Sequence, residues 1–198
     1  HILEKLPGLK LIARRGAGVD NIDLDAANKL GITVTRTEGI VGPAVAELIM
    51  AYLLDHARLL SVHSNNMKEG IWHRRLSTGL KGKTLGLIGF GSIAKETSRL
   101  ANAFGMKVLC YHRHRDPVAE EAYSAEYTDF NTLVSSSDYI SICVPLTNET
   151  RNMFNRDVFR RMKASAVLIN TARSAIVNTA DLIEALNTSQ IAGAYIDV

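Results

Sequence analysis

Cysteine is scarce in this chain, which has two cysteines and six histidines among 198 residues. Cys110 and Cys143 fall inside runs that we predict as buried strands, so we interpret them as small core residues of a protein in a reducing compartment, the cytoplasm. No histidine has the spacing to a cysteine or carboxylate that would suit a metal. We therefore expect no disulfide, no metal site and no general acid or base among these histidines.

The chain also lacks a large excess of charge of one sign and long uninterrupted apolar runs. The formal net charge is +3 and the charges are spread along the chain, which indicates a mildly basic surface rather than nucleic-acid binding. The most apolar helical pattern, residues 44–60, contains Glu47 and Asp55, so it predicts a core or interface helix and not a membrane span. No stretch has the pattern of a signal peptide, a repeat or a low-complexity segment. We expect a globular protein whose partners include neither nucleic acid nor membrane.

A glycine-rich turn lies at the centre of the chain, between a predicted strand and a predicted helix. Residues 84–88 form a short apolar run, and the sequence Gly-Phe-Gly-Ser-Ile-Ala follows at 89–94. In this context Gly89 permits a tight turn, Gly91 lets the backbone approach a pyrophosphate, and Ala94 allows the helix to pack closely on the strand. The helix N-terminus would offer N–H groups to the phosphates. The turn therefore predicts a dinucleotide site.

Strands and helices alternate after this turn. Further strands are predicted at 107–111, 139–144, 166–170 and 191–198, and helices at 128–135, 155–162 and 180–186. Such alternation predicts the α/β class, with a Rossmann-type doubly wound parallel sheet that helices cover on both faces. Ligands of such sheets collect at the carboxyl ends of the strands.

The first part of the chain predicts a separate and incomplete unit. A strand at 9–13, a helix at 22–30 and a strand at 32–35 make one βαβ pattern, which cannot bury both of its faces alone. A turn-rich joint at 37–43 follows, with Pro43 at a first helical position. We place the domains at 1–38 and 39–198. Trp72, in a polar and irregular stretch at 65–83, is expected to anchor that stretch on a core.

The end of the predicted strand 107–111 lacks the carboxylate that holds the ribose in NAD sites. His112 stands there, and Arg113 and Arg115 follow, which could bind a 2′-phosphate in bidentate fashion. We interpret this as a preference for NADP(H). The alternative is a solvated basic loop beside an ordinary NAD(H) site.

Three other strand ends carry candidate site residues. Arg173 follows the strand 166–170 and could bind a carboxylate and polarise a carbonyl, or it could be a surface arginine. Asp197 could accept a hydrogen bond from a nicotinamide carboxamide, or it could cap a turn. The loop Gly16-Ala17-Gly18 could seat a small carboxylate in an anion nest, although a plain turn is favoured on these residues alone.

Motifs along nearly the whole chain resemble those of the D-isomer-specific 2-hydroxyacid dehydrogenases, a family that includes D-3-phosphoglycerate dehydrogenases and glyoxylate/hydroxypyruvate reductases. They lie at 15–23 (RGAGVDNID), 45–47 (VAE), 80–91 (LKGKTLGLIGFG), 144–147 (VPLT), 169–173 (INTAR) and 192–198 (AGAYIDV). The stretch 112–115 looks most like the NADPH-using glyoxylate/hydroxypyruvate reductases. The family transfers a hydride between a nicotinamide cofactor and a 2-keto or 2-hydroxy acid.

This resemblance implies roles for individual residues. Arg173 matches the catalytic arginine, and the loop Gly16-Ala17-Gly18-Val19 matches the substrate-binding loop of a flavodoxin-like domain. The positions that match cofactor contacts are Thr37, Gly89, Gly91, Ser92, Ile93, His112, Arg113, Arg115, Val144, Thr171, Ala172, Arg173 and Asp197. Ser174 and Asn178 depart from the usual glycine and aspartate, and neither change should abolish cofactor binding.

The catalytic glutamate and histidine of the family follow the Asp-Val motif, which here is the end of the sequence. The resemblance therefore implies part of a longer enzyme, an NAD(P)-dependent oxidoreductase that acts on a small 2-keto acid and forms a homodimer. The alternatives are an NAD-dependent enzyme like D-3-phosphoglycerate dehydrogenase and a cofactor-binding regulator without catalysis.

Overall fold

The computed structural model describes residues 2–37 and 39–198, which form two compact units, one up to Gly42 and one from Pro43 to Val198. The first unit has parallel strands β1 (Leu11–Arg14) and β2 (Thr33–Arg36), with helix α1 (Leu24–Lys29) between them. A short 3-10 helix, Leu3–Lys5, precedes them. The βαβ pattern is thus confirmed. The boundary predicted at residue 38 falls on Glu38, which lies outside the described residues, as does His1.

The second unit is built on a six-stranded parallel sheet with the order β5-β4-β3-β6-β7-β8. Its strands are β3 (Thr84–Ile88), β4 (Lys107–Tyr111), β5 (Glu126–Tyr127), β6 (Tyr139–Ile142), β7 (Val167–Asn170) and β8 (Gly193–Ile196). The chain runs outward from β3 to β5 and then returns to place β6 beside β3. This reversal of strand order is the switch point of a Rossmann-type sheet, and ligands bind at the crevice beyond it.

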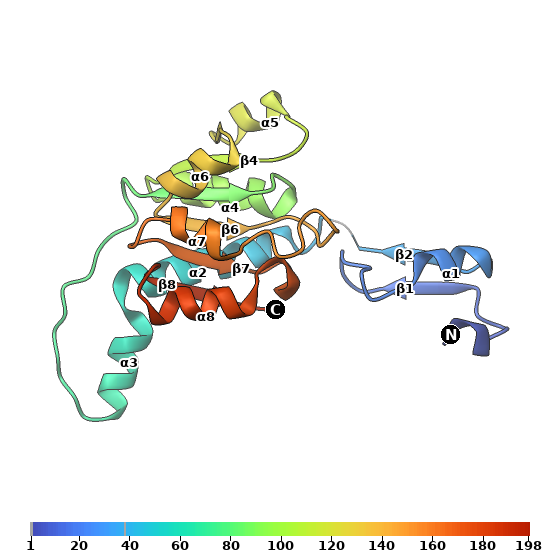
Figure 1. The fold of residues 1–198 in the computed structure, drawn as a ribbon, viewed down its shortest axis with the longest axis horizontal. Helices are drawn as coiled ribbons and strands as arrows, with labels where there is room; N and C mark the ends of the chain where they lie inside the picture. Colours follow the sequence, from blue (N-terminus) through green and yellow to red (C-terminus); the bar gives the residue numbers. More distant parts are fainter. Residues whose placement is uncertain (1, 38) are drawn as a thin grey trace. The chain divides into compact units, whose positions relative to one another are not determined.

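Helices cover both faces of this sheet, as the sequence predicted (Figure 1). On one face, α2 (Gly42–Arg58) and α4 (Ser92–Ala103) contribute side chains to a core that includes Leu53, Leu87 and Ala94. On the other, α6 (Phe130–Ser136), α7 (Arg156–Arg161) and α8 (Thr179–Asn187) pack over Ile88, Ile142 and Leu168. Burial on both faces explains why these strands are continuous apolar runs.

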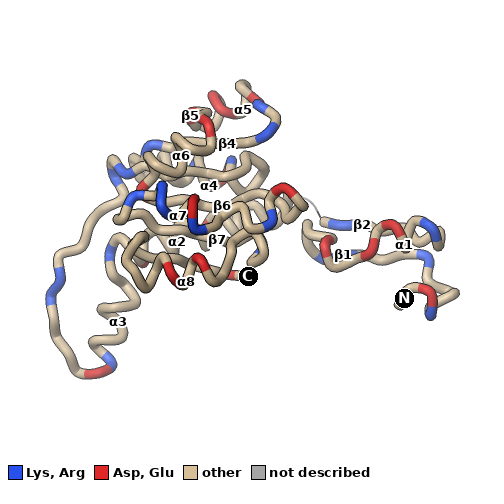
Figure 2. The backbone as a smooth tube through the Cα atoms, viewed as in Figure 1, with Lys and Arg blue, Asp and Glu red and all other residues tan. Residues whose placement is uncertain are grey.

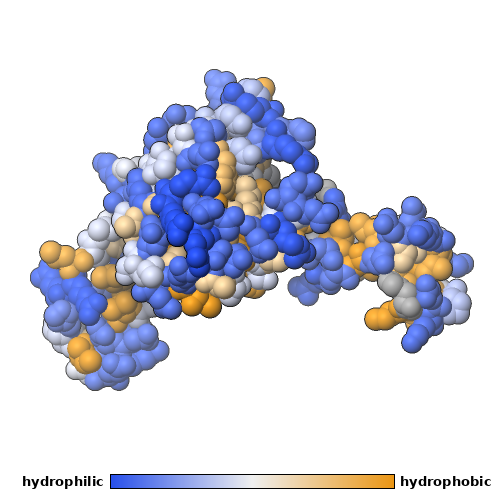
Figure 3. Space-filling view, viewed as in Figure 1, coloured by the Kyte–Doolittle hydropathy of each residue, from blue (hydrophilic) through white to orange (hydrophobic). Residues whose placement is uncertain are grey.

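A segment that we name the arm, residues 60–79, leaves this body (Figure 1). It consists of helix α3 (Leu60–Lys68) and an irregular stretch that returns to β3. Our expectation that Trp72 anchors the stretch on a core is wrong, because its side chain is 85% exposed and Leu76 is 98% exposed. Orange, hydrophobic residues are visible on the arm in Figure 3.

Two further elements between β4 and α6 were not predicted from the sequence. They are helix α5 (Pro117–Ala122), which Asp116 caps through the N–H of Ala119 at 3.1 Å, and the two-residue strand β5. Both are too short to show a periodic apolar pattern. Among residues 2–37 and 39–198, no helix is long and apolar enough to cross a membrane.

Candidate active site

The carboxyl ends of five neighbouring strands lie in one row. Ile88 of β3 pairs in register with Tyr111 on one side and Ile142 on the other, and the row continues to Asn170 and Ile196. The residues that follow these ends carry most of the predicted site in this unit. The sheet register therefore gathers them at one edge, which is the edge where the sequence placed them.

Gly89 closes the turn after β3 and has a backbone that only glycine adopts readily. Its φ is +93°, and a Cβ atom there would lie 2.7 Å from the carbonyl oxygen of Cys143 and 2.9 Å from Cγ1 of Val144. The turn therefore packs closely against the end of β6. Val144, predicted as a cofactor contact, lies beside Gly89 as a result.

Gly91 differs from Gly89 in its surroundings. A Cβ atom on Gly91 would meet no atom within 4 Å, and its φ of −83° is ordinary for any residue. It caps the twelve-residue helix α4 without a side chain to occupy the helix N–H groups, and Ser92 and Ile93 form the first turn. Open space at a helix N-terminus fits a pyrophosphate, whose charge the exposed N–H groups and the helix dipole stabilise.

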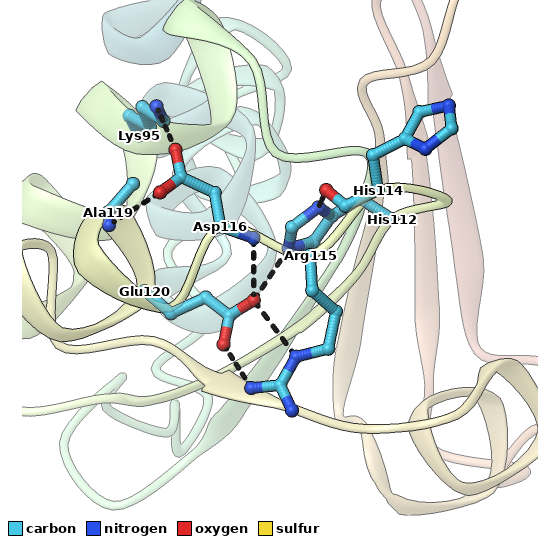
Figure 4. Close-up of polar contacts among 7 residues, drawn as sticks. All are labelled: Lys95, His112, His114, Arg115, Asp116, Ala119 and Glu120. Carbon is cyan, nitrogen blue, oxygen red and sulfur yellow. Dashed lines mark hydrogen bonds and ion pairs between the residues drawn. The ribbon is translucent and has the colours of Figure 1, made fainter.

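The end of β4 holds a charged cluster around a buried carboxylate (Figure 4). Glu120 of α5 is 5% exposed and accepts hydrogen bonds from Nε and Nη2 of Arg115 at 3.3 and 2.5 Å. The Arg115 guanidinium also holds the pKa of Glu120 below its usual value. It lies over the Tyr127 ring, 4.2 Å from the ring centre, a cation–π contact. Arg115 therefore fixes the loop 112–116 to α5.

His112 also points into this cluster. Its Nε2 is 3.0 Å from Glu120, its Nδ1 is 2.6 Å from the carbonyl oxygen of His114, and its ring stacks on Phe90 with centres 5.6 Å apart. Only 11% of its side chain is exposed. Arg113, by contrast, is exposed at the strand end, where basic residues cluster between β4 and α5 (Figure 2). Arg115 is exposed as well, with 53% of its side chain accessible, but its guanidinium is bound to Glu120.

The loop after β7 holds Thr171, Ala172 and Arg173, all half-buried. Arg173 donates from Nη1 to the carbonyl oxygen of Ala172 at 2.6 Å. The buried side chain of Asn170 holds this loop from below: its Oδ1 accepts from the N–H of Ala172 at 3.0 Å, and its Nδ2 donates to the carbonyl oxygen of Arg173 at 2.9 Å. A guanidinium placed here can bind a carboxylate and polarise a carbonyl oxygen.

Asp197 follows β8 at the same edge and lies near Tyr52 of α2. Burial and the neighbouring Asp197 raise the pKa of Tyr52, so its hydroxyl stays protonated. The Tyr52 ring stacks on Tyr195 with centres 4.8 Å apart. Asp197 is thus oriented by α2, and its exposed position leaves it accessible to a ligand amide.

In the first unit, the loop after β1 carries the other predicted residues. Gly16 has a φ of +131°, and its carbonyl oxygen accepts from the N–H of Thr37 at 3.1 Å. Arg14 donates from Nε to the carbonyl oxygen of Gly18 at 3.2 Å. The loop from Gly16 to Val19 and Thr37 therefore lie together at the carboxyl ends of β1 and β2, and Arg14 supports the loop.

The two thiols near these strand ends do not ionise readily. Burial raises the pKa of Cys110 to about 12 and that of Cys143 to about 11, so both stay protonated at neutral pH. Both are free cysteines. Within residues 2–37 and 39–198, no group of three histidine, cysteine or acidic side chains could hold a metal ion.

Two residues that shape the site were not singled out from the sequence. Asparagine at the last position of a strand favours a turn through its side chain, and this signal could have identified Asn170. Glu120 gives no such signal, because the helix that buries it is too short to be recognised. The ligand contacts predicted for individual residues stay predictions.

Comparison with known proteins adds independent evidence to this geometry. Residues 50–198 match the family model of the D-isomer specific 2-hydroxyacid dehydrogenase NAD binding domain. The glyoxylate reductase of Thermococcus litoralis is 46% identical over 207 aligned residues, which cover 100% of this chain and 62% of the relative. The hydroxypyruvate reductase of Thermotoga maritima is 42% identical, with 100% of this chain and 64% of the relative covered.

A solved structure agrees with these relatives. The D-lactate dehydrogenase of Aquifex aeolicus, complexed with NAD and lactic acid, superposes with a TM-score of 0.92 at 37% identity and covers 100% of this chain and 60% of the neighbour. The chain thus spans less than two thirds of the length of the proteins it matches. The resemblance stated from the motifs is confirmed. The chain belongs to the D-isomer specific 2-hydroxyacid dehydrogenase family.

Proposed function

We propose that the protein of which this sequence forms at least a part reduces a small 2-keto acid, glyoxylate or hydroxypyruvate, with NADPH in preference to NADH. The observation that carries the proposal is Arg173, half-buried beyond β7 and one strand away from the switch point between β3 and β6. The 46% identity with a glyoxylate reductase along the whole chain supports the substrate class. We also propose that the protein acts in the cytoplasm.

The residues of this chain have separate tasks in that reaction. The turn at Gly89 and Gly91 and the N-terminus of α4 hold the pyrophosphate, and Val144, Thr171, Ala172 and Asp197 line the nicotinamide end. A bound nicotinamide supplies the hydride for C2 of the substrate.

Arg173 binds the substrate carboxylate and withdraws electron density from the carbonyl oxygen, which stabilises the charge that develops there. The loop from Gly16 to Val19 is assigned to the same carboxylate on the resemblance. The proton for that oxygen is expected from the histidine that follows the Asp-Val motif in the family.

A phosphorylated substrate is the alternative within the family, and it would need additional cations near the Gly16 loop. Arg14 and Arg15 are the cations nearest in sequence. The guanidinium of Arg14 donates to the carbonyl oxygens of Gly18 and Arg15, whereas the side chain of Arg15 is exposed and remains a candidate for a phosphate. A substrate panel with both reduced cofactors tests the proposal, and equal turnover of the phosphorylated and unphosphorylated keto acids would contradict it.

The preference for NADPH is expected to depend on Arg113. Changing Arg113→Asp should raise the KM for NADPH by about 10- to 100-fold, because a cation that pairs with the 2′-phosphate becomes an anion that repels it. The KM for NADH should stay the same or fall. Steady-state kinetics with each cofactor give the comparison, and Arg160→Asp on the exposed face of α7 makes the same charge change elsewhere. Equal effects of R113D on both cofactors would remove the claim.

We also propose that a second copy of this chain covers the arm, which makes the protein a homodimer. Trp72 and Leu76 are the most exposed large apolar side chains in the described residues, and Ile71 beside them is 47% exposed. Several large apolar side chains exposed on one segment are typical of an interaction surface. Helix α2, which we predicted as a core or interface helix and which buries Ile49 and Leu53 in the core, leads directly into the arm.

Replacing two arm residues should separate the dimer. The double variant Trp72→Glu, Leu76→Glu is expected to sediment as a monomer at micromolar concentration, where the wild type sediments as a dimer, because buried unpaired carboxylates oppose association. Val118→Glu is the control, since Val118 is 78% exposed on α5, outside the arm. A wild-type monomer, or a double variant that stays dimeric, would contradict this assignment.

A further inference from the structure

Asn170 is a fully buried polar side chain at the carboxyl end of β7, directly before the loop that carries Arg173. Its backbone continues the sheet: Asn170 pairs in register with Ile142 and Ile196, and its carbonyl oxygen accepts from the N–H of Asp197 at 3.0 Å. The side chain is not needed for these contacts. Its two hydrogen bonds go entirely to the loop, so the side chain and the backbone of Asn170 have separable roles.

The two side-chain bonds enclose one peptide unit. Oδ1 accepts from the N–H of Ala172, and Nδ2 donates to the carbonyl oxygen of Arg173. The carbonyl oxygen of Ala172 lies between these two points along the backbone, and it accepts from Nη1 of Arg173 at 2.6 Å. Asn170 thus fixes the backbone on both sides of the carbonyl group that holds the guanidinium.

We propose that Asn170 is a positioning residue for Arg173. Asn170 fixes the backbone of the loop to which the guanidinium is hydrogen-bonded, and it thereby sets the direction of the guanidinium. The inference rests on the function proposed above, in which Arg173 binds the substrate. Asn170 itself need not touch the substrate. Its contribution is preorganisation, since a shift of about 1 Å in a reacting group can cost about 100-fold in rate.

Only a side chain with one acceptor and one donor at this spacing satisfies both bonds. Aspartate has nearly the same shape and can still accept from the N–H of Ala172, but its second oxygen would face the carbonyl oxygen of Arg173, and two acceptors repel. Serine has a shorter side chain with a single oxygen, so it cannot reproduce the two separate contacts of the amide. An Asn170→Asp variant therefore removes one half of the clamp while changing the volume of the site very little.

A double-mutant cycle tests the proposal on the full-length protein. We expect Asn170→Asp to lower kcat/KM for the keto acid, at saturating NADPH, by about 10- to 100-fold when Arg173 is present. In the Arg173→Lys background, where no guanidinium depends on the clamp, the same change should cost less than about 3-fold. Thermal unfolding of each variant accompanies the kinetics. If N170D does not fold, Asn170→Ser takes its place in the cycle.

The outcomes separate this inference from the function on which it rests. Equal losses in both backgrounds would overturn it, because an effect that is independent of Arg173 is a general disturbance of the sheet edge. If the wild type reduces no keto acid, the proposed function fails, and the crystal structure of the N170D protein then tests the clamp alone. We expect Nη1 of Arg173 to have left the carbonyl oxygen of Ala172, and an unchanged contact would overturn the inference.

Discussion

Replacing Gly89 with alanine is expected to reduce cofactor affinity by about 100-fold, or about 2.7 kcal/mol, and to destabilise the second unit. The added Cβ would lie 2.7 Å from the carbonyl oxygen of Cys143, at a φ of +93° that costs a side chain conformational strain. Strain and overpacking each cost about 1–3 kcal/mol, so the free energy of unfolding should fall by about 3 kcal/mol. The turn must move away from β6, and the end of α4 moves with it.

Gly91 provides the matched control, since it lies two residues away in the same turn. A Cβ on Gly91 meets no protein atom within 4 Å, so Gly91→Ala should change the stability by less than about 0.5 kcal/mol. The same Cβ would occupy the space where we place the pyrophosphate. We therefore expect G91A to unfold like the wild type and to bind NADPH about 10- to 100-fold more weakly.

Thermal unfolding and NADPH fluorescence titration measure the two effects separately. For G89A, a loss of about 3 kcal/mol corresponds to a fall in melting temperature of about 6–12 °C in a protein of this size. A G91A protein with wild-type stability and wild-type NADPH affinity would show that the phosphates do not approach this turn. Wild-type stability in G89A would show that the contact with Cys143 is easily relieved.

The strands that are buried on both faces were predicted best. The segments β3 and β4 begin and end at the predicted residues, because a run of apolar side chains between glycine or polar residues leaves little freedom in its limits. Asn155 caps α7 as predicted, since its side chain accepts from the N–H groups of Asp157 and Val158. Local chemistry of this kind can be recognised without a tertiary structure.

The arm and the loop after β4 were predicted least well, and for different physical reasons. In the arm, the side chains of Trp72 and Leu76 are exposed and are not part of the described core. A sequence pattern does not distinguish side chains that are buried within one chain from those that another molecule would cover. In the loop, Arg113 and Arg115 have the same chemistry in the sequence. The buried carboxylate of Glu120, which binds Arg115, becomes apparent only when α5 is folded over it.

Replacing Arg173 is expected to have the largest effect on turnover. Arg173→Ala should lower kcat/KM for the keto acid by about 1000-fold or more, because removal of one preorganised donor to a developing oxyanion costs about 100- to 1000-fold and the carboxylate contact is lost as well. Arg173→Lys keeps the charge but not the planar pair of donors, so it should recover only a small part of the rate. Arg160→Ala, on the exposed face of α7, is the control for loss of an arginine.

The affinity for NADPH is the measurement that separates a substrate-binding role of Arg173 from a cofactor-binding role. We place the pyrophosphate at the turn at Gly89 and Gly91, which follows β3, and β6 separates β3 from β7, so R173A should bind NADPH with an affinity within about 3-fold of the wild type. Free guanidinium added to R173A should restore part of the turnover, since it can occupy the space that the side chain vacates. A large loss of NADPH affinity without rescue would instead show that the cofactor contact expected of Arg173 from the resemblance is its main role, and the substrate carboxylate would then need another cation. Normal turnover by R173A would reject the catalytic assignment outright.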